Sequence, residues 1–397
     1  MELDYSKIIG REEDLYKEDL RVLEQEIIDK VQSSKFLVVG AAGTIGQAIS
    51  KEIFKRNPQT LHTVDISENN LVELVRDIRS SFGYGSGDFR TFALDCGSKE
   101  FEIMLENEGP YDYIFNLSAL KHVRSEKDPY TIMRMIKVNI INSMNLAKFA
   151  QQMNAKNYFC VSTDKAANPV SMMGASKRIM EMFLHRESTQ QNISMARFAN
   201  VAFSDGSLLS GFEKRLLKRQ PLSAPNNIRR YFVTPKESGE LCLLSGLFGN
   251  NRDIFFPKLD EHIHLISFSD IANNFLIENG YQPYHAKSES DARENIEKLL
   301  SNNQWPCHFF ESITSGEKHY EEFFTENEDL DMKRFKSIGV IRNEAVFNDS
   351  DLDGFISNID SLLQKKDLKK KDILSEFFRI LPDFNHVETG KDLDQQM

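Results

Sequence analysis

KFLVVGAAGTIG, residues 35–46, is a short apolar run that leads into three glycines spaced three residues apart. The run predicts a buried strand, and the residues after it, QAISKEIFKRN (47–57), predict a helix. In such a turn Gly40 allows a sharp bend, Gly43 lets the backbone approach a pyrophosphate, and Gly46 lets the helix pack close to the sheet. Free N–H groups and the positive end of the helix dipole then favour phosphate. The stretch therefore predicts the first βα unit of a dinucleotide-binding domain.

Further apolar runs follow this turn and alternate with stretches of helical periodicity: TLHTVDIS (60–67), RTFALDC (90–96), YDYIFNLSA (111–119), KNYFCVST (156–163) and ISMARFANV (193–201). Strands in a parallel sheet are uniformly apolar because helices cover both faces. The alternation predicts an α/β fold with a doubly wound parallel sheet of the Rossmann type. After Val201 the pattern is less regular, with Gly, Pro and Asn turns, which predicts a smaller α/β lobe that binds substrate.

Changes of pattern divide the chain into four expected parts. They are an N-terminal helical extension (1–34), an NAD-binding Rossmann domain (35–201), a mainly substrate-binding lobe (202–340) with a polar insertion near 283–303, and a C-terminal helical tail (341–397). Within the extension, residues 11–32 predict an amphipathic helix whose apolar stripe is Tyr16, Leu20, Leu23, Ile27 and Val31. We expect this stripe to pack on the main domain or on a second subunit. The basic run in the tail predicts the solvated face of a helix, with a membrane contact as the alternative.

The bulk composition argues against several classes of function. The chain has 397 residues and a formal net charge of −11, and such a field repels nucleic acid and anionic membranes. The four cysteines form no C-x-x-C pair and the nine histidines no H-E-x-x-H pattern, so we expect reduced thiols and no metal. The charged N-terminus is unlike a secretory signal, and no apolar run approaches the roughly 18 residues that span a bilayer. We therefore expect a soluble cytoplasmic protein without an integral membrane segment.

Further cofactor contacts are expected near the carboxyl ends of the first four strands. Asp65 ends the second strand, 19 residues after Gly46, where a carboxylate can bind the adenosine ribose hydroxyls and repel a 2′-phosphate. This position favours NAD over NADP, with a helix-cap role for Asp65 as the alternative. Asp95 can reach the adenine amino group or can serve only as a turn residue. The remaining expected cofactor contacts are Thr44, Ile45, Cys96, Leu117 and Ala119.

The segment STDKAANPVSMMGASK (162–177) is the most informative about chemistry. It follows an apolar strand and opens a helix, on which Met173 and Lys177 share a face. The segment resembles the STDKAANP motif of bacterial polysaccharide-biosynthesis 4,6-dehydratases, in the extended short-chain dehydrogenase/reductase superfamily, whose best-known members act on UDP-GlcNAc. The resemblance covers roughly residues 35–325 through stretches in the same order: NLSALKHV (116–123), KVNIINSMNL (137–146), RFANVAFSDGS (197–207), RRYFVT (229–234) and SGEKHYEEF (315–323).

The resemblance implies a reaction in three steps on a nucleotide sugar, with NAD bound. Hydride leaves C4 of the hexose, the resulting ketone acidifies the C5 proton so that water is eliminated across C5 and C6, and hydride returns to C6. In this scheme Asp164 protonates the departing C6 hydroxyl and neutral Lys165 removes the C5 proton. Thr163 hydrogen-bonds the C4 oxygen, and Lys177 binds the nicotinamide ribose. The alternative for Asp164 and Lys165 is a surface ion pair at a strand end.

Some positions depart from the family pattern. The superfamily usually has tyrosine four residues before the active-site lysine, where this chain has Met173, and a thioether cannot exchange a proton. A subgroup of these dehydratases looks similar, with Met in that place, so activity is still expected with another acceptor for the C4 hydroxyl proton. Ala199 and Phe203 stand where the family usually has Gly, and Asp205 where it often has Arg. These departures favour an unusual sugar or nucleotide.

Substrate contacts are expected from four further residues. Lys121 and His122 lie just past the fourth strand, at the sheet edge where ligands bind. Asn200 and Arg230 are candidates for the diphosphate, which Arg can bind through two parallel hydrogen bonds. A packed structural role for His122 and a surface charge for Arg230 are the alternatives.

The expected function is a nucleotide-sugar 4,6-dehydratase that converts UDP-N-acetylglucosamine, or a related nucleotide-linked N-acetylhexosamine, to a 4-keto-6-deoxy sugar for surface glycans. Three alternatives stay open: a dehydratase that also inverts C5, a nucleotide-sugar epimerase or 4-reductase, and a non-catalytic NAD-binding scaffold. The adjacent Asp164 and Lys165 argue against a simple epimerase, whereas Met173 supports the scaffold. The sequence does not distinguish UDP from GDP. A homo-oligomer is expected, with the two terminal segments as assembly elements.

Overall fold

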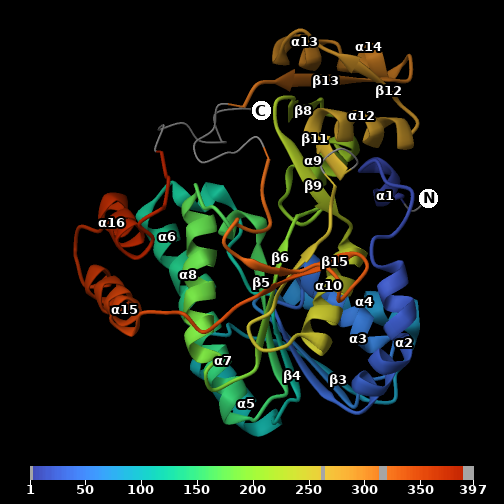
Figure 1. Cartoon of the computed structure of the whole chain (residues 1–397). Coiled ribbons are helices and arrows are strands. Elements are labelled where there is room, and N and C mark those ends of the chain that lie inside the picture. The colour runs from blue at the N-terminus through green and yellow to red at the C-terminus, as the bar shows by residue number, and fades with distance from the viewer. Residues whose placement is uncertain (1–2, 261–263, 313–319, 388–397) are drawn as a thin grey trace.

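The computed structural model describes residues 3–260, 264–312 and 320–387, and Figure 1 shows their arrangement. Within these residues one large sheet has the strand order β14-β15-β10-β6-β5-β4-β1-β2-β3. Its strands are β1 (Lys35–Val39), β2 (Thr60–Asp65), β3 (Asp88–Ala93), β4 (Tyr113–Asn116), β5 (Asn157–Thr163), β6 (Ile193–Phe198), β10 (Ile254–Pro257), β14 (Asp329–Asp331) and β15 (Ile338–Arg342). All neighbours from β3 to β10 are parallel, and β15 and β14 add an antiparallel edge. The predicted parallel sheet is confirmed.

Helices cover both faces of this sheet, which makes it doubly wound (Figure 1). One face carries α3 (Thr44–Phe54), α4 (Glu68–Phe82) and α10 (Pro235–Phe248), and the other carries α5 (Lys99–Glu108), α6 (Pro129–Ile136), α7 (Asn142–Gln152) and α8 (Met172–Glu187). The central strands β1, β2, β4, β5, β6 and β10 are almost wholly buried, from Phe36 in β1 to Phe255 in β10, whereas the edge strand β3 is partly exposed. Strand order reverses between β1 and β4, so the loops after these two strands diverge at the carboxyl edge and leave a crevice for a ligand.

The N-terminal region differs from the single helix expected over 11–32. It contains a short α1 (Tyr5–Ile8) and then α2 (Lys17–Gln32). The residues between them are not helical because Gly10 has a φ of +80° and the Arg11 side chain is drawn into a buried ion pair. The expected stripe does pack on the main domain: Tyr16, Ile27 and Val31 are fully buried in its core.

The smaller lobe is built from two three-stranded sheets at the carboxyl edge of the large one (top of Figure 1). The sheets are β11-β9-β7 and β12-β13-β8, formed by β7 (Asn200–Val201), β8 (Leu222–Pro225), β9 (Arg229–Val233), β11 (Leu265–Ser267), β12 (Gln282–His285) and β13 (Gln304–Phe310). The helices of the lobe are α9 (Leu208–Leu217), α12 (Phe268–Glu278), α13 (Glu289–Glu294) and α14 (Ile296–Leu300).

Two expectations about this region need correction. Residues 202–340 are not one lobe, because α10, β10, β14 and part of β15 return to the large sheet, where their apolar side chains complete its core. The polar stretch 283–303 is not a plain insertion either. It is the crossover from β12 through α13 and α14 to β13, and the two strands pair in parallel. Its composition is polar because α13 and α14 bury few side chains, Ala292 and Leu299.

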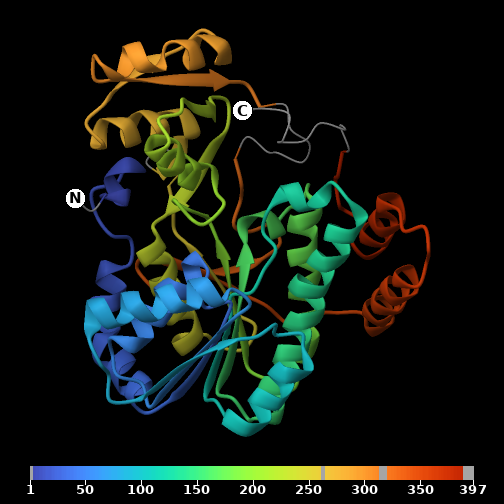
Figure 2. The same cartoon turned by 180° about the vertical axis from the view of Figure 1, so that it is seen from behind.

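The C-terminal region forms a helical hairpin against the α6–α8 face. Its helices are α15 (Asp349–Leu363) and α16 (Lys370–Ile380), drawn in red beside the green α8 in Figure 2. Phe355 and Phe377 are fully buried in the main core, and the Phe355 ring lies 6.3 Å from that of Phe183 in α8. Among the residues that the structure describes, no helix combines the length and the apolar character needed to cross a membrane.

Candidate active site

A cavity of about 380 Å³ lies between the carboxyl edge of the large sheet and the lobe. Fourteen of the residues expected from the sequence line it: Gly40, Gly43, Thr44, Ile45, Gly46, Leu117, Ala119, Lys121, His122, Thr163, Lys165, Met173, Lys177 and Asn200. They come from the loop after β1 and the start of α3, from the loop after β4, from the end of β5 to the first turns of α8, and from β7. The cavity thus joins the glycine turn to the STDKAANP segment, which are more than a hundred residues apart in sequence.

The glycine turn has the shape of a phosphate cradle. A Cβ atom at Gly40, whose φ is +77°, would lie 2.6 Å from the Ser118 nitrogen, and one at Gly46 would lie 2.1 Å from the Gly40 oxygen. Gly43 is different, because the nearest atom to its Cβ would be 3.7 Å away. The protein itself therefore needs glycine at 40 and 46, whereas the open space over Gly43 suits a ligand. Gly43 caps α3 without a side-chain hydrogen bond, so the helix N-terminus is available to an anion.

The two acidic residues expected near the adenosine occupy different surroundings. The Asp65 carboxylate accepts hydrogen bonds from the backbone N–H groups of Ala42, at 3.0 Å, and Ser67, at 2.9 Å. The cap of α4 is Ser67, not Asp65, so Asp65 is tied to the glycine turn instead. Asp95 is exposed and accepts from the Gly97 N–H at 2.8 Å, which is a turn contact. Neither residue lines the cavity, nor does Cys96, whose Sγ lies 3.8 Å from the Ser118 hydroxyl.

The pair Asp164–Lys165 begins a single 3₁₀ turn, η3 (Asp164–Ala166), directly after β5. The Asp164 carboxylate is 2% exposed and accepts from the Thr163 hydroxyl at 2.8 Å and from the Lys165 Nζ at 2.9 Å. The Lys165 Nζ also donates to the Asn200 Oδ1 at 3.2 Å. Lys165 and Thr163 line the cavity, and Asp164 lies behind them. A carboxylate and an amine are therefore hydrogen-bonded to each other beside the cavity. Because Asp164 is buried, the alternative of a surface ion pair does not describe it.

The helix α8 presents Met173 and Lys177 to the same cavity, as its spacing predicts. The Lys177 Nζ is buried and donates to the Val161 oxygen at 3.0 Å. Burial lowers the pKa of Lys177 below its usual value, although Cys160 and Glu181 oppose this change. The Met173 N–H donates to the Glu126 carboxylate at 2.9 Å. Burial raises the pKa of Glu126 above its usual value, although the backbone hydrogen bonds from Met173 and Met172 act in the opposite direction.

The expected substrate residues separate into two groups. Lys121 and His122 line the cavity mouth, and the Lys121 Nζ donates to the Ser204 hydroxyl at 3.2 Å. Desolvation lowers the pKa of Lys121, and the Asp205 carboxylate opposes this effect. Arg230 lies outside the cavity lining. It is 4% exposed, and its Nη2 lies 3.8 Å from the Glu321 carboxylate, so the simple surface charge is wrong.

A buried ionic network beneath the cavity was not anticipated from the sequence. The Ser162 hydroxyl donates to Glu181 at 2.6 Å, and Arg197 binds both Glu181 oxygens and both Glu328 oxygens at 2.8–3.0 Å. Burial favours the neutral acid at Glu181, but the Arg197 guanidinium outweighs it and lowers the pKa of Glu181 to about 2. The sequence signal for this network is a pair of opposite charges. Arg197 stands in a mostly apolar strand, and Glu181 stands one helical turn after Lys177. The network holds the end of β5 against α8.

A π-helical turn, η2 (Lys137–Ile141), separates α6 from α7 and was also missed. It places Asn139 so that its amide accepts from the Leu120 N–H at 2.9 Å and donates to the Leu120 oxygen at 3.0 Å. The same amide donates to Ser176, next to Lys177, at 3.0 Å. A polar residue inside an apolar helix was the only sequence signal. π turns of this kind are frequent at functional sites.

The lobe supplies the opposite wall of the cavity, and here the sequence identified little beyond Asn200. The additional lining residues on this side are Phe198, Ala199, Val201, Ser204, Ser207, Leu208, Leu209, Phe232 and Phe268. They are mostly apolar, with the hydroxyls of Ser204 and Ser207 as the exceptions, and Ser204 accepts from Lys121. Val161 and Ser162 complete the lining on the β5 side.

Comparisons with known proteins agree with this geometry. A family model described as "Polysaccharide biosynthesis protein" matches residues 36–343. The capsular polysaccharide biosynthesis protein CapD of Staphylococcus aureus is 28% identical over 322 residues, which cover 80% of this chain and 49% of CapD, so the chain spans about half the length of that relative. A Campylobacter jejuni protein named UDP-N-acetylglucosamine 4,6-dehydratase (inverting) is 26% identical over 234 residues, covering 56% of this chain and 66% of that protein. Among solved structures, Pen from Bacillus thuringiensis has the same fold, with a TM-score of 0.63 at 21% identity, covering 79% of this chain and 88% of Pen.

Proposed function

The chain belongs to the family of polysaccharide biosynthesis proteins, and from that premise we propose that it is a nucleotide-sugar 4,6-dehydratase. Its substrate is UDP-N-acetylglucosamine or a related nucleotide-linked N-acetylhexosamine. The observation that carries the proposal is the Asp164–Lys165 pair, in which Lys165 lines the same cavity as the glycine turn and Asp164 lies directly behind it. Elimination of water needs an acid and a base side by side, and this pair supplies both.

The cofactor in this proposal is NAD, and the residues of the cavity fit it. Gly40 and Gly46 shape the turn at the N-terminus of α3, the space over Gly43 is open to a pyrophosphate, and Asp65 lies beside this turn through its bond to Ala42. A carboxylate in this position accepts ribose hydroxyls and repels a 2′-phosphate. When bound, the nicotinamide supplies the hydride acceptor for C4 and the hydride donor for C6.

Asp164 and Lys165 divide the elimination between them. Asp164, protonated for this step, donates its proton to the C6 hydroxyl, which leaves as water, while the neutral Lys165 amine takes the proton from C5. The salt bridge of 2.9 Å between them provides the route by which a proton returns from the ammonium to the carboxylate. Asn200 holds the Lys165 amine from the lobe side at 3.2 Å. Atoms balance, because one proton is taken from C5, one is given to the departing hydroxyl, and one water leaves.

The C4 hydroxyl is positioned by the neighbouring residues. Thr163 lines the cavity one residue before the pair and hydrogen-bonds the C4 oxygen. Lys177 binds the nicotinamide ribose from α8, where its lowered pKa eases release of a proton. Met173 exchanges no proton, so the C4 proton passes to Asp164 or through water to Lys177. Lys121 and Asn200 are the proposed contacts for the sugar diphosphate on this side of the lobe.

A second reaction, 4,6-dehydration with inversion at C5, is favoured by one comparison, the Campylobacter relative named as inverting. The same C5 carbanion gives either stereochemistry, depending on the face from which it is reprotonated. The two reactions differ in the product alone. The NMR coupling constants of the sugar ring protons distinguish them.

The test is to incubate the purified chain with UDP-GlcNAc, UDP-GalNAc and GDP-linked hexoses, without added reductant, and to follow the mass of each sugar. We expect one of the UDP-HexNAc substrates to lose the mass of one water, and the Lys165→Ala variant to leave it intact. Turnover in deuterium oxide should place deuterium at C5, because C5 is reprotonated from solvent, whereas C6 receives the hydride that left C4. If every sugar stays intact while bound NAD is confirmed by its absorbance, the dehydratase proposal is wrong.

A further inference from the structure

The N-terminal residues 3–19, named here the strap, lie outside the part of the chain that the family model matches. They nevertheless pass from the lobe to the helices on the cofactor side of the cavity (Figure 1). We propose that the strap fixes the wall of the cavity formed by the turn Phe203–Ser207, and that Tyr5 is the positioning residue for this turn. The kinetic part of this inference rests on the proposed function, and its structural part does not.

One end of the strap is built into the core of the lobe. Ile8 and Ile9 belong to the apolar cluster that also contains Phe203 and Phe275, although nearly two hundred residues separate them in sequence. The Asn274 amide of α12 donates to the Ile8 oxygen at 3.0 Å. An ion pair joins Lys7 to Glu278 at the end of the same helix. The lobe therefore lacks part of its own core without the strap.

Tyr5 lies directly against the turn that borders the cavity. Its ring stacks on the Phe203 ring, with the centroids 4.7 Å apart and the planes 21° apart. Its hydroxyl donates to Glu213 of α9 at 3.1 Å. Phe203 has a φ of 54°, a left-handed conformation that a bulky side chain adopts only where its surroundings hold it. The stacked Tyr5 ring and the neighbouring Phe275 are the surroundings that hold Phe203.

The turn held in this way reaches the cofactor side of the cavity. The Asp205 N–H donates to the Thr44 hydroxyl at 3.0 Å, and Ser204 accepts from Lys121. Gly206, with a φ of 71°, packs so closely on His122 that a Cβ would lie 2.8 Å from its Nε2. A shift of this turn therefore changes the width of the cavity between the glycine turn and the lobe.

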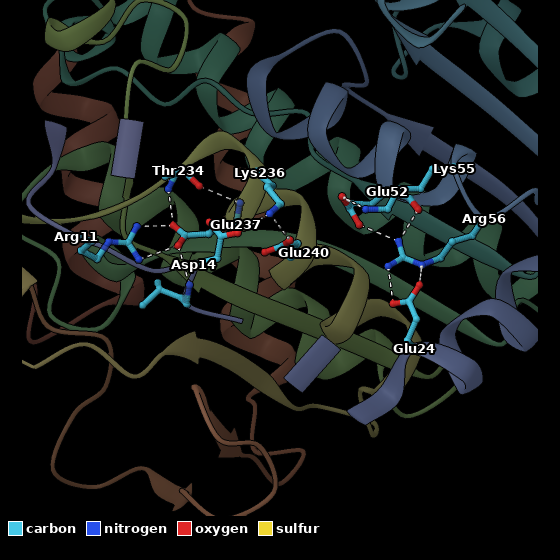
Figure 3. A network of polar contacts seen from close by, with 11 residues as sticks. Arg11, Asp14, Glu24, Glu52, Lys55, Arg56, Thr234, Lys236, Glu237 and Glu240 are labelled. Carbon is cyan, nitrogen blue, oxygen red and sulfur yellow. Dashed lines mark hydrogen bonds and ion pairs between the residues drawn. The ribbon is translucent and has the colours of Figure 1, made fainter. Parts of the chain in front are cut away.

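The other end of the strap is anchored on the cofactor side through buried charges (Figure 3). Arg11 donates to both oxygens of Glu237 in α10, at 2.8 and 2.5 Å, and the Leu15 N–H donates to the same carboxylate at 2.9 Å. Glu237 also closes the capping box of α10 with Thr234. This helix packs on α3 so tightly that a Cβ at Gly239 would lie 2.6 Å from the Ala48 backbone. The strap thus connects the turn to the helix that carries the glycine cradle.

The arrangement predicts a selective effect on substrate binding. Asp164 and Lys165 lie on the opposite wall, in the β5–α8 connection, and make no contact with the strap among the described residues. Loss of Tyr5 therefore loosens the turn without moving the acid and the base. The effect appears in KM and in the mobility of the turn, whereas kcat changes little.

The experiment compares Tyr5→Ala with Tyr5→Phe, which keeps the stacking but not the hydroxyl. Tyr84→Ala is the matched control, because Tyr84 is 87% exposed, lies beyond α4 and is remote from the cavity. We expect Tyr5→Ala to raise KM for the nucleotide sugar by about 3- to 10-fold, the range for one lost aromatic pair, with kcat within about twofold. Hydrogen exchange of the amides in residues 203–209 should accelerate in the same variant. Tyr5→Phe and Tyr84→Ala should behave as the unaltered chain does in both measurements.

The two measurements separate failure of this inference from failure of the proposed function. If the unaltered chain turns over no nucleotide sugar, hydrogen exchange still tests the strap, because it needs no substrate. Unchanged exchange at 203–209 in Tyr5→Ala overturns the inference. The inference is also wrong if Tyr5→Phe loses as much activity as Tyr5→Ala, or if Tyr5→Ala lowers kcat and leaves KM unchanged.

Discussion

The two walls of the cavity are held in place by contacts of very different range along the chain. The cofactor wall consists of loops that directly follow strands of the large sheet, after β1, β4 and β5, and each is fixed by its own βα unit. The lobe wall collects residues from separate segments, between Ala199 and Leu209 and at Phe232 and Phe268, and Tyr5 at the far end of the sequence stacks on Phe203 in its turn. In the proposed reaction the acid and the base therefore lie on the wall that local βα units position, whereas the wall proposed to contact the sugar depends on distant contacts.

The largest effect on turnover is expected when the acid or the base is removed from the cofactor wall. We expect Lys165→Ala and Asp164→Asn each to lower kcat by about 10²–10⁴-fold, the usual range for one general acid or base. Each change removes one partner of an ion pair whose carboxylate is buried, which costs stability as well, so a thermal melt accompanies the kinetics. Steady-state turnover measures the loss.

Lys165→Ala carries a second readout. Oxidation at C4 does not need the C5 base, so this variant should accumulate reduced nicotinamide absorbance on addition of substrate. Circular dichroism provides the folding control. Normal turnover by Lys165→Ala would show that the base lies elsewhere. If that base were a lobe residue, the catalytic groups would not be confined to the cofactor wall.

An intermediate effect is expected at the seam between α10 and α3, where the strap reaches the cofactor side. Glu240 is 2% exposed, and its Oε2 makes no hydrogen bond within the described residues. Burial raises the pKa of Glu240 to about 8, with Lys236 opposing the rise and with Glu52, Asp14 and Glu237 adding to it. The folded state therefore resists ionisation that the unfolded chain undergoes near its ordinary pKa, so stability falls as pH rises from about 4.5 to 8.

The change Glu240→Gln should remove this pH dependence. We expect its melting temperature to exceed that of the unaltered chain by about 2–5 °C at pH 8.5 and to match it near pH 5. Glu106→Gln, an exposed glutamate on α5, serves as the matched control and should show no such difference. An equal gain at both pH values would attribute the effect to packing, and the charge argument would fail.

The smallest effect is expected from Met173→Ala, on the cofactor wall itself. Met173 lines the cavity, but a thioether carries no proton. Activity should therefore stay within about threefold, far above that of the Lys165 and Asp164 variants. Met173 is 4% exposed, so a thermal melt is needed to separate lost packing from lost chemistry. A loss as large as that of Lys165→Ala would give this position a direct role in the reaction.

The sequence predicted the cofactor wall well because each part of it is encoded locally. Apolar runs, the glycine spacing and the STDKAANP segment lie within single βα units, and the cavity brings fourteen expected residues together. The lobe was predicted poorly for the opposite reason. The path of β10, β14 and β15 back to the large sheet depends on long-range pairing that no local pattern reveals.

Individual residues show the same limit. Arg230 has the chemistry to bind a diphosphate, but the buried Glu321 lies beside it instead, and the two are 91 positions apart. The helix expected from residue 11 begins at Lys17 because Arg11 contacts Glu237, far along the chain. In both cases a tertiary ion pair decides the outcome, and helical periodicity or residue type alone carries no information about the partner.

The π-helical turn at Lys137–Ile141 restricts how the length of this chain can vary. A π turn holds one residue more than an α turn, so deleting one residue there would restore a continuous α-helix in which α6 and α7 keep their faces while the side chains inside the turn change position. Asn139 now faces Leu120 on one side of this turn, and Ser143 accepts from Asn116 on the other. A one-residue deletion in this turn would therefore cost the contacts of Asn139 with Leu120 and Ser176, which depend on the π turn.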